Sequence, residues 1–312
     1  MGRRRRPPPG ARPLHGWVVI DKPLNITSAA VVTRVLEDLR ATRAGHGGTL
    51  DPLATGVLPV ALGEATKTVS YVMKGRKTYR FVLAWGEGRS TGDAEGKVTE
   101  TSDIRPGRKH IEAVLGEFTG AILQVPPAFS AIKVNGQRAY KLARAEREFT
   151  LEPREVEIHR IEIKDIPDPD HAEFEVSCGK GVYIRSLARD IAARLGTVGH
   201  VHSLRRTRVG PFTEDMAISL DNLKVLGHSA AQPECLFPIE TALDDIPALA
   251  LTEDQAQSLR MGRAVQVFRT GNSEIPEEMS EGAVVFATTG GKPVALARMK
   301  SGMLQPVRVL NL

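Results

Sequence analysis

The residues best suited to chemistry lie in the segment GHGGTLDPLATG, at positions 45–56. Pro52 biases the backbone of Asp51 away from the helical region, and the surrounding glycines permit a ligand to approach the chain closely. A carboxylate held in this way can act as a nucleophile or as a general base. As an isolated residue, however, an aspartate in a glycine-rich loop most often only builds a turn. The segment alone therefore leaves both interpretations open.

The sequence offers no pattern for binding a metal or a nucleotide cofactor. His46 has no second ligand at helical or hairpin spacing, which leaves packing or an RNA contact as its role. The two cysteines, Cys178 and Cys235, are too few for a disulfide framework and lack metal-ligand spacing with any histidine. No glycine-rich phosphate loop is present. We therefore expect neither a metal nor a cofactor, and we expect both cysteines to be reduced and buried.

Charge is distributed unevenly along the chain. The net charge is +5, but residues 1–13 contain five arginines and no acidic residue, so the rest of the chain is balanced. Basic residues gather at 67–80, 133–147 and 176–210, whereas acidic residues dominate 153–175. This segregation is expected of a protein that steers a polyanion such as RNA into a groove. It is also compatible with ordinary solvated helix faces, so charge alone does not decide.

The composition is typical of a folded protein. Hydrophobic residues make up 41% and charged residues 25% of the 312 residues, which argues against a disordered or fibrous chain. No window holds about 18 consecutive apolar residues, and the N-terminal arginines are not followed by an apolar stretch. We therefore expect no membrane span and no signal peptide, and we expect a cytoplasmic protein.

The spacing of apolar residues predicts a mixture of helices and strands around this loop. Val31, Val35 and Leu39 share one helical face behind a cap at Thr27 or Ser28. Further helix patterns lie at 64–75, 109–118, 138–147 and 183–195, and strand patterns at 16–20, 79–83, 154–164, 172–178 and 200–209. The glycine- and proline-rich residues 41–59 are predicted to be an ordered loop. Because no regular βαβ repeat occurs, we predict an α+β fold with a mixed, largely antiparallel sheet and flanking helices.

Three regions are predicted along the chain. Residues 1–13 form a disordered tail, because consecutive prolines oppose a helix and the arginines repel one another. Residues 14–240 form the main domain, and a linker is expected within 225–247, where glycine and proline recur. Residues 248–312, with a short helix followed by alternating apolar runs, form a small β-rich domain.

Several sequence blocks resemble one known family in the same order. GHGGTLDPLATGVLPVALGEATK, at residues 45–67, resembles the catalytic segment of the bacterial tRNA pseudouridine synthase B (TruB) family. The other blocks are GWVVIDKP at 16–23, KTYRF at 77–81, GDAEG at 92–96, VPPAFSAIKVNGQRAYKLAR at 125–144, GKGVYIRSLARD at 179–190 and HVHSLRR at 200–206. Together they span most of residues 16–210. Residues 248–312 resemble, less closely, the PUA fold, a small β-barrel found on RNA-modifying enzymes.

The resemblance implies an isomerase that converts a uridine of the tRNA T arm, at tRNA position 55, to pseudouridine. The bond between N1 and C1′ breaks, the base rotates, and C5 joins C1′, with no redox change and no energy input. An ionised aspartate could attack C6, attack C1′, or remove a sugar proton, and the sequence leaves these routes open. The family acts alone on tRNA, so we expect a monomer that needs no protein partner.

Catalytic roles come to individual residues from the same resemblance. Asp51 corresponds to the family's catalytic aspartate, and Arg185 to the arginine that pairs with it. Such a pairing makes physical sense, because a guanidinium favours the charged form of an enclosed carboxylate. Without the resemblance, Arg185 would be interpreted as an exposed helix arginine.

Tyr79 corresponds to the aromatic residue that stacks on the target base after the base has flipped out of the RNA. Flipping costs a few kcal/mol, and stacking on an aromatic ring returns about 1–3 kcal/mol. A strand tyrosine is otherwise more often part of the core. Further substrate contacts are implied for His46, Tyr183 and Leu204, and contacts to the RNA backbone are expected from Lys22, Lys67, Arg144 and Arg205.

Two positions depart from the family's pattern. Gly47 stands where many relatives have a larger residue such as threonine, and Ser90 replaces the first aspartate of an acidic TDTxD pattern. The sequence therefore does not determine how stiff the loop around Gly47 is, or whether the segment around Ser90 contacts RNA. Two other functions remain as alternatives. A non-catalytic RNA-binding or tRNA-folding protein would use the same groove, and a guide-RNA-dependent relative would carry a long lysine-rich C-terminal tail, which this sequence lacks.

Overall fold

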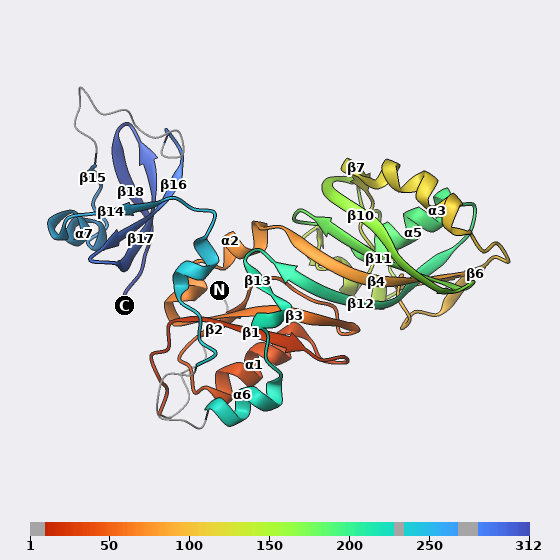
Figure 1. The fold of residues 1–312 in the computed structure, drawn as a ribbon, viewed down its shortest axis with the longest axis horizontal. Helices are drawn as coiled ribbons and strands as arrows, with labels where there is room; N and C mark the ends of the chain where they lie inside the picture. Colours follow the sequence, from red (N-terminus) through yellow and green to blue (C-terminus); the bar gives the residue numbers. More distant parts are fainter. Residues whose placement is uncertain (1–9, 228–233, 268–279) are drawn as a thin grey trace.

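The computed structural model describes residues 10–227, 234–267 and 280–312 (Figure 1). Residues 1–9 of the expected tail lie outside the described residues. Residues 10–13 are placed, and the Arg12 amide donates a hydrogen bond to the Arg40 carbonyl at 2.7 Å. No helix in the described part of the chain is long and apolar enough to span a membrane.

A nine-stranded sheet forms the centre of the molecule (Figure 1). Its main path runs β1 (Gly16–Lys22), β3 (Ala54–Leu62), β12 (Gly199–Val209), β4 (Lys77–Trp85), β11 (His171–Cys178), β10 (Arg154–Asp168) and β7 (Gly120–Gln124). β2 (Ala44–His46) also pairs with β3, and β13 (Phe212–Thr213) with β12. Among these described strands, β3 and β12 are parallel and the other pairs are antiparallel. The predicted α+β fold with a mixed, largely antiparallel sheet is confirmed.

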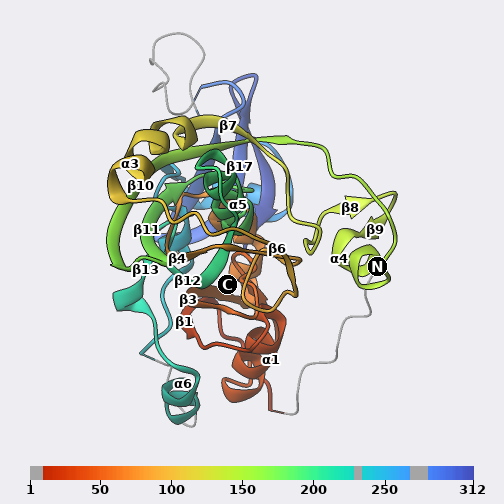
Figure 2. The same ribbon diagram turned by 90° about the vertical axis from the view of Figure 1, so that its right-hand side faces the viewer.

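Helices flank this sheet, and two small hairpins extend from it. The α-helices are α1 (Ser28–Asp38), α2 (Val69–Lys74), α3 (Arg108–Leu115), α4 (Ala139–Arg144), α5 (Ile184–Arg194) and α6 (Leu220–Gly227), and the 3-10 helices are η1 (Gly63–Lys67), η2 (Gly116–Phe118), η3 (Glu214–Met216) and η4 (Ile239–Leu243). The hairpins are β5 (Glu87–Arg89) with β6 (Val98–Thr101), and β8 (Lys133–Val134) with β9 (Gln137–Arg138). The β8–β9 hairpin and α4 project away from the sheet as an arm (Figure 2).

Two apolar clusters pack on the two faces of the sheet. Because successive strand residues point to opposite faces, Val18 and Ile20 of β1 join one cluster while Trp17 and Val19 join the other. The first cluster contains the buried sides of α1 and α5. The second also contains residues of the C-terminal sheet, including Phe286. The two sheets therefore share part of their core.

The C-terminal region forms a second, five-stranded sheet that curls into half a barrel (Figure 1). Its order is β14 (Ala248–Ala250), β16 (Val284–Thr289), β17 (Lys292–Lys300), β18 (Met303–Val309) and β15 (Val265–Gln266). α7 (Glu253–Arg260) packs against it, and Thr252 and Gln255 form a capping box at its start. Among the described residues the sheet is open, since β14 and β15 are its two ends.

One local prediction was wrong. Residues 41–59 contain β2 and the first part of β3 rather than only a loop, because the glycines and Pro59 are accommodated by pairing with β1 and β12. The linker within 225–247 stays a prediction, and Phe237 of that segment exchanges two backbone hydrogen bonds of 2.8 Å with Trp17. Residues 228–233 of that segment lie outside the described residues.

Candidate active site

A cavity of about 590 Å³ opens between β4, β12, the start of α5 and the loop that follows β2. Its volume falls in the range of roughly 300–1,000 Å³ that is usual for small-molecule sites. Six of the candidate site residues from the sequence lie in its wall: Asp51, Tyr79, Arg144, Tyr183, Arg185 and Leu204. The fold therefore brings side chains from five distant segments to one place.

Asp51 and Arg185 form an ion pair in this cavity. Nη2 of Arg185 lies 2.9 Å from Oδ2 of Asp51. The aspartate side chain is 40% exposed, whereas the arginine is only 6% exposed. The carboxylate is therefore open to a ligand, while its cationic partner is held inside the protein, where an ionic hydrogen bond is stronger than in water.

Arg185 is fixed by three further contacts from two loops. Its Nη1 donates to the carbonyl of Thr91 at 2.9 Å, and its Nη2 donates to the carbonyl of Phe129 at 3.0 Å. Its Nε lies 3.8 Å from Oδ2 of Asp93, which is itself buried. Asp93 was not singled out from the sequence, although it lies inside the GDAEG block. Its position shows that the guanidinium bridges two carboxylates.

Ser90, one of the two departures from the family pattern, stabilises the turn that carries Asp93. Its hydroxyl oxygen accepts a hydrogen bond from the amide of Lys97 at 3.1 Å. Oδ1 of Asp93 accepts another from the amide of Glu95 at 3.2 Å. The turn at 89–97 is therefore held by short polar side chains, and Ser90 takes part in that local structure.

The loop of Asp51 is anchored by polar groups from β1 and α1. The Ser28 hydroxyl both accepts a hydrogen bond from the Leu50 amide, at 2.8 Å, and donates one to the Leu50 carbonyl, at 3.0 Å. The Lys22 ammonium donates to the carbonyl of Pro52 at 3.1 Å. These bonds fix the backbone on both sides of the aspartate.

The prediction that Lys22 contacts the RNA backbone does not agree with its burial. The side chain is fully buried, and its ammonium also donates to the carbonyls of Pro23 and Ile26, at 2.9 and 2.8 Å. Burial lowers the pKa of Lys22 to about 8, and the nearby Asp51 carboxylate opposes this shift. The physical reason is that three carbonyls enclose the ammonium, so it supports the loop and faces no solvent.

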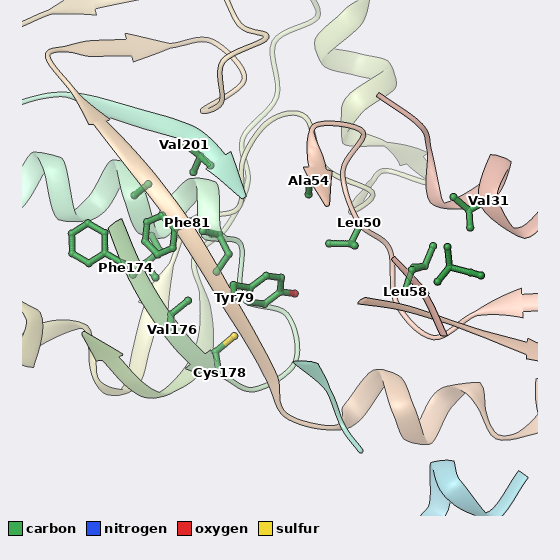
Figure 3. Close-up of a cluster of buried hydrophobic side chains, with 14 of the residues drawn as sticks. Val31, Leu50, Ala54, Leu58, Tyr79, Phe81, Phe174, Val176, Cys178 and Val201 are labelled. Atoms are coloured by element: carbon green, nitrogen blue, oxygen red, sulfur yellow. The ribbon is translucent and has the colours of Figure 1, made fainter. Parts of the chain in front are cut away.

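Tyr79 lies at the border between the core and the cavity. The rings of Phe81 and Phe174 stack with their centroids 5.2 Å apart. Tyr79 lies beside Phe81, and its hydroxyl points away from Phe174 (Figure 3). Only 8% of Tyr79 is exposed. Burial raises the pKa of the Tyr79 hydroxyl, and the Arg206 guanidinium opposes that rise. One side of the residue thus belongs to the core while the other belongs to the cavity wall.

Lys77, two residues before Tyr79, is a cavity residue that the sequence did not single out. Its ammonium donates to the carbonyls of Met73 and Gly75, at 2.8 and 2.6 Å. Burial lowers its pKa to about 8. A lysine inside a basic run is normally interpreted as exposed, so nothing local in the sequence marked this one as buried.

Tyr183 and Leu204 hold the remaining sides of the cavity. The Tyr183 amide donates to the side-chain oxygen of Gln124 at 2.8 Å, which joins the start of α5 to the end of β7. Burial raises the pKa of the Tyr183 hydroxyl. Leu204 lies on β12, between its register partners Ala54 on β3 and Phe81 on β4.

His46 lies outside the cavity wall, at the end of β2. Its Nδ1 is buried and has no hydrogen-bond partner among the described residues. Burial lowers the pKa of His46, and the Arg206 charge lowers it further. At the neighbouring Gly47, an added Cβ would lie 2.9 Å from Cγ1 of Val72. The glycine at this departure from the family pattern therefore fits a tightly packed position.

The other three residues predicted to contact the RNA backbone, Lys67, Arg144 and Arg205, differ in their partners within the protein. Lys67 donates to Oε2 of Glu64 at 2.5 Å and to the carbonyl of Val309 at 2.6 Å, which joins η1 to the C-terminal sheet. Arg205 pairs with Asp21 and Glu214. The Arg144 guanidinium lies 5.8 Å from the Tyr140 ring centroid, and both line the cavity.

The side chains that line the cavity suit a particular kind of chemistry. No group of three or more His, Cys, Asp or Glu side chains in the described residues is arranged to hold a metal. The cavity combines a half-exposed carboxylate, a buried guanidinium and an aromatic wall. Such a set can perform nucleophilic or general-base chemistry on a flat polar ring.

Comparisons with known proteins identify the family of this chain. The model of the TruB family pseudouridylate synthase N-terminal domain matches residues 36–184, and that of the tRNA pseudouridylate synthase B C-terminal domain matches residues 185–244. The tRNA pseudouridine synthase B of Rhodospirillum rubrum is 51% identical over 312 residues, covering 100% of both chains. That of Caulobacter vibrioides is 50% identical over 298 residues, covering 95% of this chain and 96% of the relative.

Solved structures show the same fold. A chain in a crystal structure of a Cbf5–Nop10–Gar1 complex superimposes with a TM-score of 0.75 and 27% identity, covering 99% of this chain and 92% of that chain. A chain in a structure of an H/ACA RNP bound to a substrate RNA containing 2′-deoxyuridine superimposes with a TM-score of 0.71 and 26% identity, covering 100% of this chain and 92% of that chain. With end-to-end relatives at about half identity and family models over most of the main sheet, this chain belongs to the TruB family and is a pseudouridylate synthase.

Proposed function

We propose that this chain converts the uridine at position 55 in the T arm of tRNA to pseudouridine, acting alone, with Asp51 as the catalytic aspartate. The observation that carries the proposal is the ion pair of Asp51 with the buried Arg185 in an open cavity. The curated relatives in Rhodospirillum rubrum and Caulobacter vibrioides carry the name tRNA pseudouridine synthase B, which supports tRNA as the substrate.

In this proposal, Arg185 positions the reacting carboxylate. The arginine contacts Oδ2 of Asp51, which leaves Oδ1 to face the nucleotide. That oxygen would attack C6 of the base, attack C1′, or remove a sugar proton while the bond between N1 and C1′ breaks. After the base has rotated, C5 joins C1′, and the bond from Asp51 to C1′ or C6 breaks, or the sugar proton is returned, so that the carboxylate is regenerated. The proton on C5 then leaves, and N1 gains a proton. Atoms and electrons balance without an added reactant.

The target uridine must leave its stack to reach this carboxylate. Extrusion of a base costs a few kcal/mol. A cavity of about 590 Å³ has room for a nucleoside, and the Tyr79 ring in its wall would recover about 1–3 kcal/mol by stacking. Tyr183 and Leu204 would close the sides of the pocket around the flipped base.

The RNA would be held mainly by basic side chains outside the pocket. Arg144 lines the cavity and lies on the projecting arm, where it can reach a phosphate. Arg205 and Lys67 already form ion pairs with Asp21 and Glu64, so we expect them to contribute less to RNA affinity than Arg144. His46 would contact the RNA from the end of β2. The fully buried Lys22 is no longer included.

The proposal divides the chain into a catalytic domain at 14–240 and a PUA-like RNA-binding domain at 248–312. The separate five-stranded sheet supports this division. The second domain would add affinity for tRNA, and the chemistry would stay in the first. We further propose a monomer that works in the cytoplasm, where its tRNA substrate is found, without a cofactor or a protein partner.

The test is incubation of the protein with an unmodified T-arm stem-loop, without nucleotide, metal or guide RNA. Pseudouridine at the candidate position is detected as an alkali-stable carbodiimide adduct, and a stem-loop with cytidine at that position is the control. We expect one modified site in the uridine substrate only. Tight binding without modification would instead support an RNA-folding protein, and modification only after addition of a guide RNA would support the guide-dependent alternative.

A further inference from the structure

Arg206 is a fully buried arginine whose role the proposed chemistry does not explain. It lies on β12 and is 1% exposed. A buried guanidinium is costly unless its donors are satisfied. Among the described residues it forms no ion pair with a carboxylate, so backbone dipoles must satisfy it.

Those backbone dipoles belong to the segment that carries Asp51. Nη2 of Arg206 donates to the Gly48 carbonyl at 3.1 Å, and Nε donates to the Val57 carbonyl at 2.9 Å. A longer contact of 3.4 Å joins Nη1 to the Thr49 carbonyl. One side chain therefore binds the segment both before and after the aspartate.

The same guanidinium faces Tyr79 on the neighbouring strand. Arg206 and Tyr79 are register partners on β12 and β4. The Arg206 charge is the largest influence opposing the rise of the Tyr79 pKa that burial causes. Arg206 is thus the side chain through which the aspartate loop and the aromatic wall of the cavity are connected.

Two glycines let the chain close around this arginine. Gly56 has a φ of +98°, and an added Cβ would lie 2.3 Å from the backbone oxygen of Arg206. Gly48 has a φ of +135°, and its added Cβ would meet Nη1 of Arg206 at 3.5 Å. Only glycine adopts such conformations readily. Gly48 and Gly56 therefore allow β12 and the Arg206 side chain to pack closely against this segment, in addition to permitting the approach of a ligand.

We propose that Arg206 is a positioning residue, which fixes the loop of Asp51 at a constant distance from the Tyr79 ring. This inference rests on the proposed function. The planar fork of arginine spreads its donors over the carbonyls of Gly48, Thr49 and Val57, whereas a lysine carries all its donors on one nitrogen atom and cannot occupy the three positions of the fork. The charge alone would therefore not replace it. Arg206 acts through the loop and Tyr79, so its loss should slow the reaction without weakening RNA binding.

The test compares Arg206→Lys with Arg208→Lys in the full chain. Arg208 is exposed on the same strand, and its Nε donates to the Gly210 carbonyl at 2.7 Å, so it is a matched control. We measure the single-turnover rate at saturating T-arm stem-loop and the Kd of the same RNA. Arg206→Lys should lower the rate about 100-fold, the loss that a displacement of about 1 Å can cause, and leave the Kd unchanged. Arg208→Lys should keep the wild-type rate.

A second variant covers the case in which Arg206→Lys does not fold. Gly48→Ala strains the backbone at the carbonyl that Arg206 binds and keeps the arginine itself. It should also reduce the rate with an unchanged Kd. A wild-type rate in either folded variant, or a loss confined to the Kd, would overturn the role of Arg206. If the wild-type protein forms no pseudouridine, the proposed function fails instead, so the two failures are distinguishable.

Discussion

Replacing Arg185 with lysine tests whether the guanidinium positions the reacting carboxylate. The wild-type side chain binds Asp51 at 2.9 Å and is held by carbonyls of Thr91 and Phe129, at 2.9 and 3.0 Å. A lysine could keep the charge, but its single ammonium could not reach both carbonyls and the carboxylate together. At least one ionic hydrogen bond would be lost.

The size of the effect follows from that loss. A hydrogen bond to a charged group contributes about 1.5–3 kcal/mol. Because each 1.36 kcal/mol corresponds to about a tenfold change in rate, Arg185→Lys should slow turnover by roughly 10- to 150-fold. Binding of the RNA should change little, since the arginine is only 6% exposed and makes its contacts inside the cavity.

The assay is a single-turnover measurement of pseudouridine formation at saturating T-arm stem-loop, with the Kd measured in parallel. Arg160→Lys is a suitable control because Arg160 is 70% exposed and lies on β10. A wild-type rate for folded Arg185→Lys would refute the positioning argument. Equal losses in rate and affinity would show that Arg185 mainly binds RNA.

Further expectations concern the supports of the site. Ser28→Ala removes both hydrogen bonds to buried Leu50, so urea unfolding should show a loss of about 1–3 kcal/mol, and an unchanged midpoint would contradict this. The lowered pKa of Lys22 means that the unfolded chain binds more protons between about pH 8 and 10.5. Lys22 therefore makes the free energy of unfolding rise with pH across that window, and Lys22→Met should remove that part of the slope. Deleting 248–312 should weaken tRNA binding, and full retention of binding would argue against an RNA-binding role for these residues. It should also lower the melting temperature, because Phe286 packs in the cluster shared with the main sheet, and an unchanged melting temperature would argue against that shared core.

Elements with strong local signals were predicted well from the sequence. The helix α1 has Thr27 as its cap, whose side chain accepts from the Ala30 amide, and its apolar residues repeat at helical spacing. β3 was missed because its glycines and Pro59 disfavour a strand locally. Its pairing with β1 and β12 stabilises it, and that pairing involves residues far away in the chain.

The candidate site divides in the same way. The residues around Asp51 left a reactive carboxylate and a simple turn both open, and the family resemblance pointed to Asp51 and Arg185 as a pair. Nothing local indicated that Lys22 is enclosed by three carbonyls or that Arg206 is buried without a carboxylate partner. Both positions depend on how β1, β3 and β12 pack, so only the three-dimensional structure could identify these supports.

The catalytic role of Asp51 is tested by measuring pseudouridine formation by the Asp51→Asn variant on the unmodified T-arm stem-loop. The amide keeps the shape of the side chain but removes the charge that would attack the nucleotide or accept its proton. We expect no detectable isomerisation, with a Kd for the RNA within a few-fold of the wild-type value. Turnover close to the wild-type rate in this variant would show that a different group performs the chemistry.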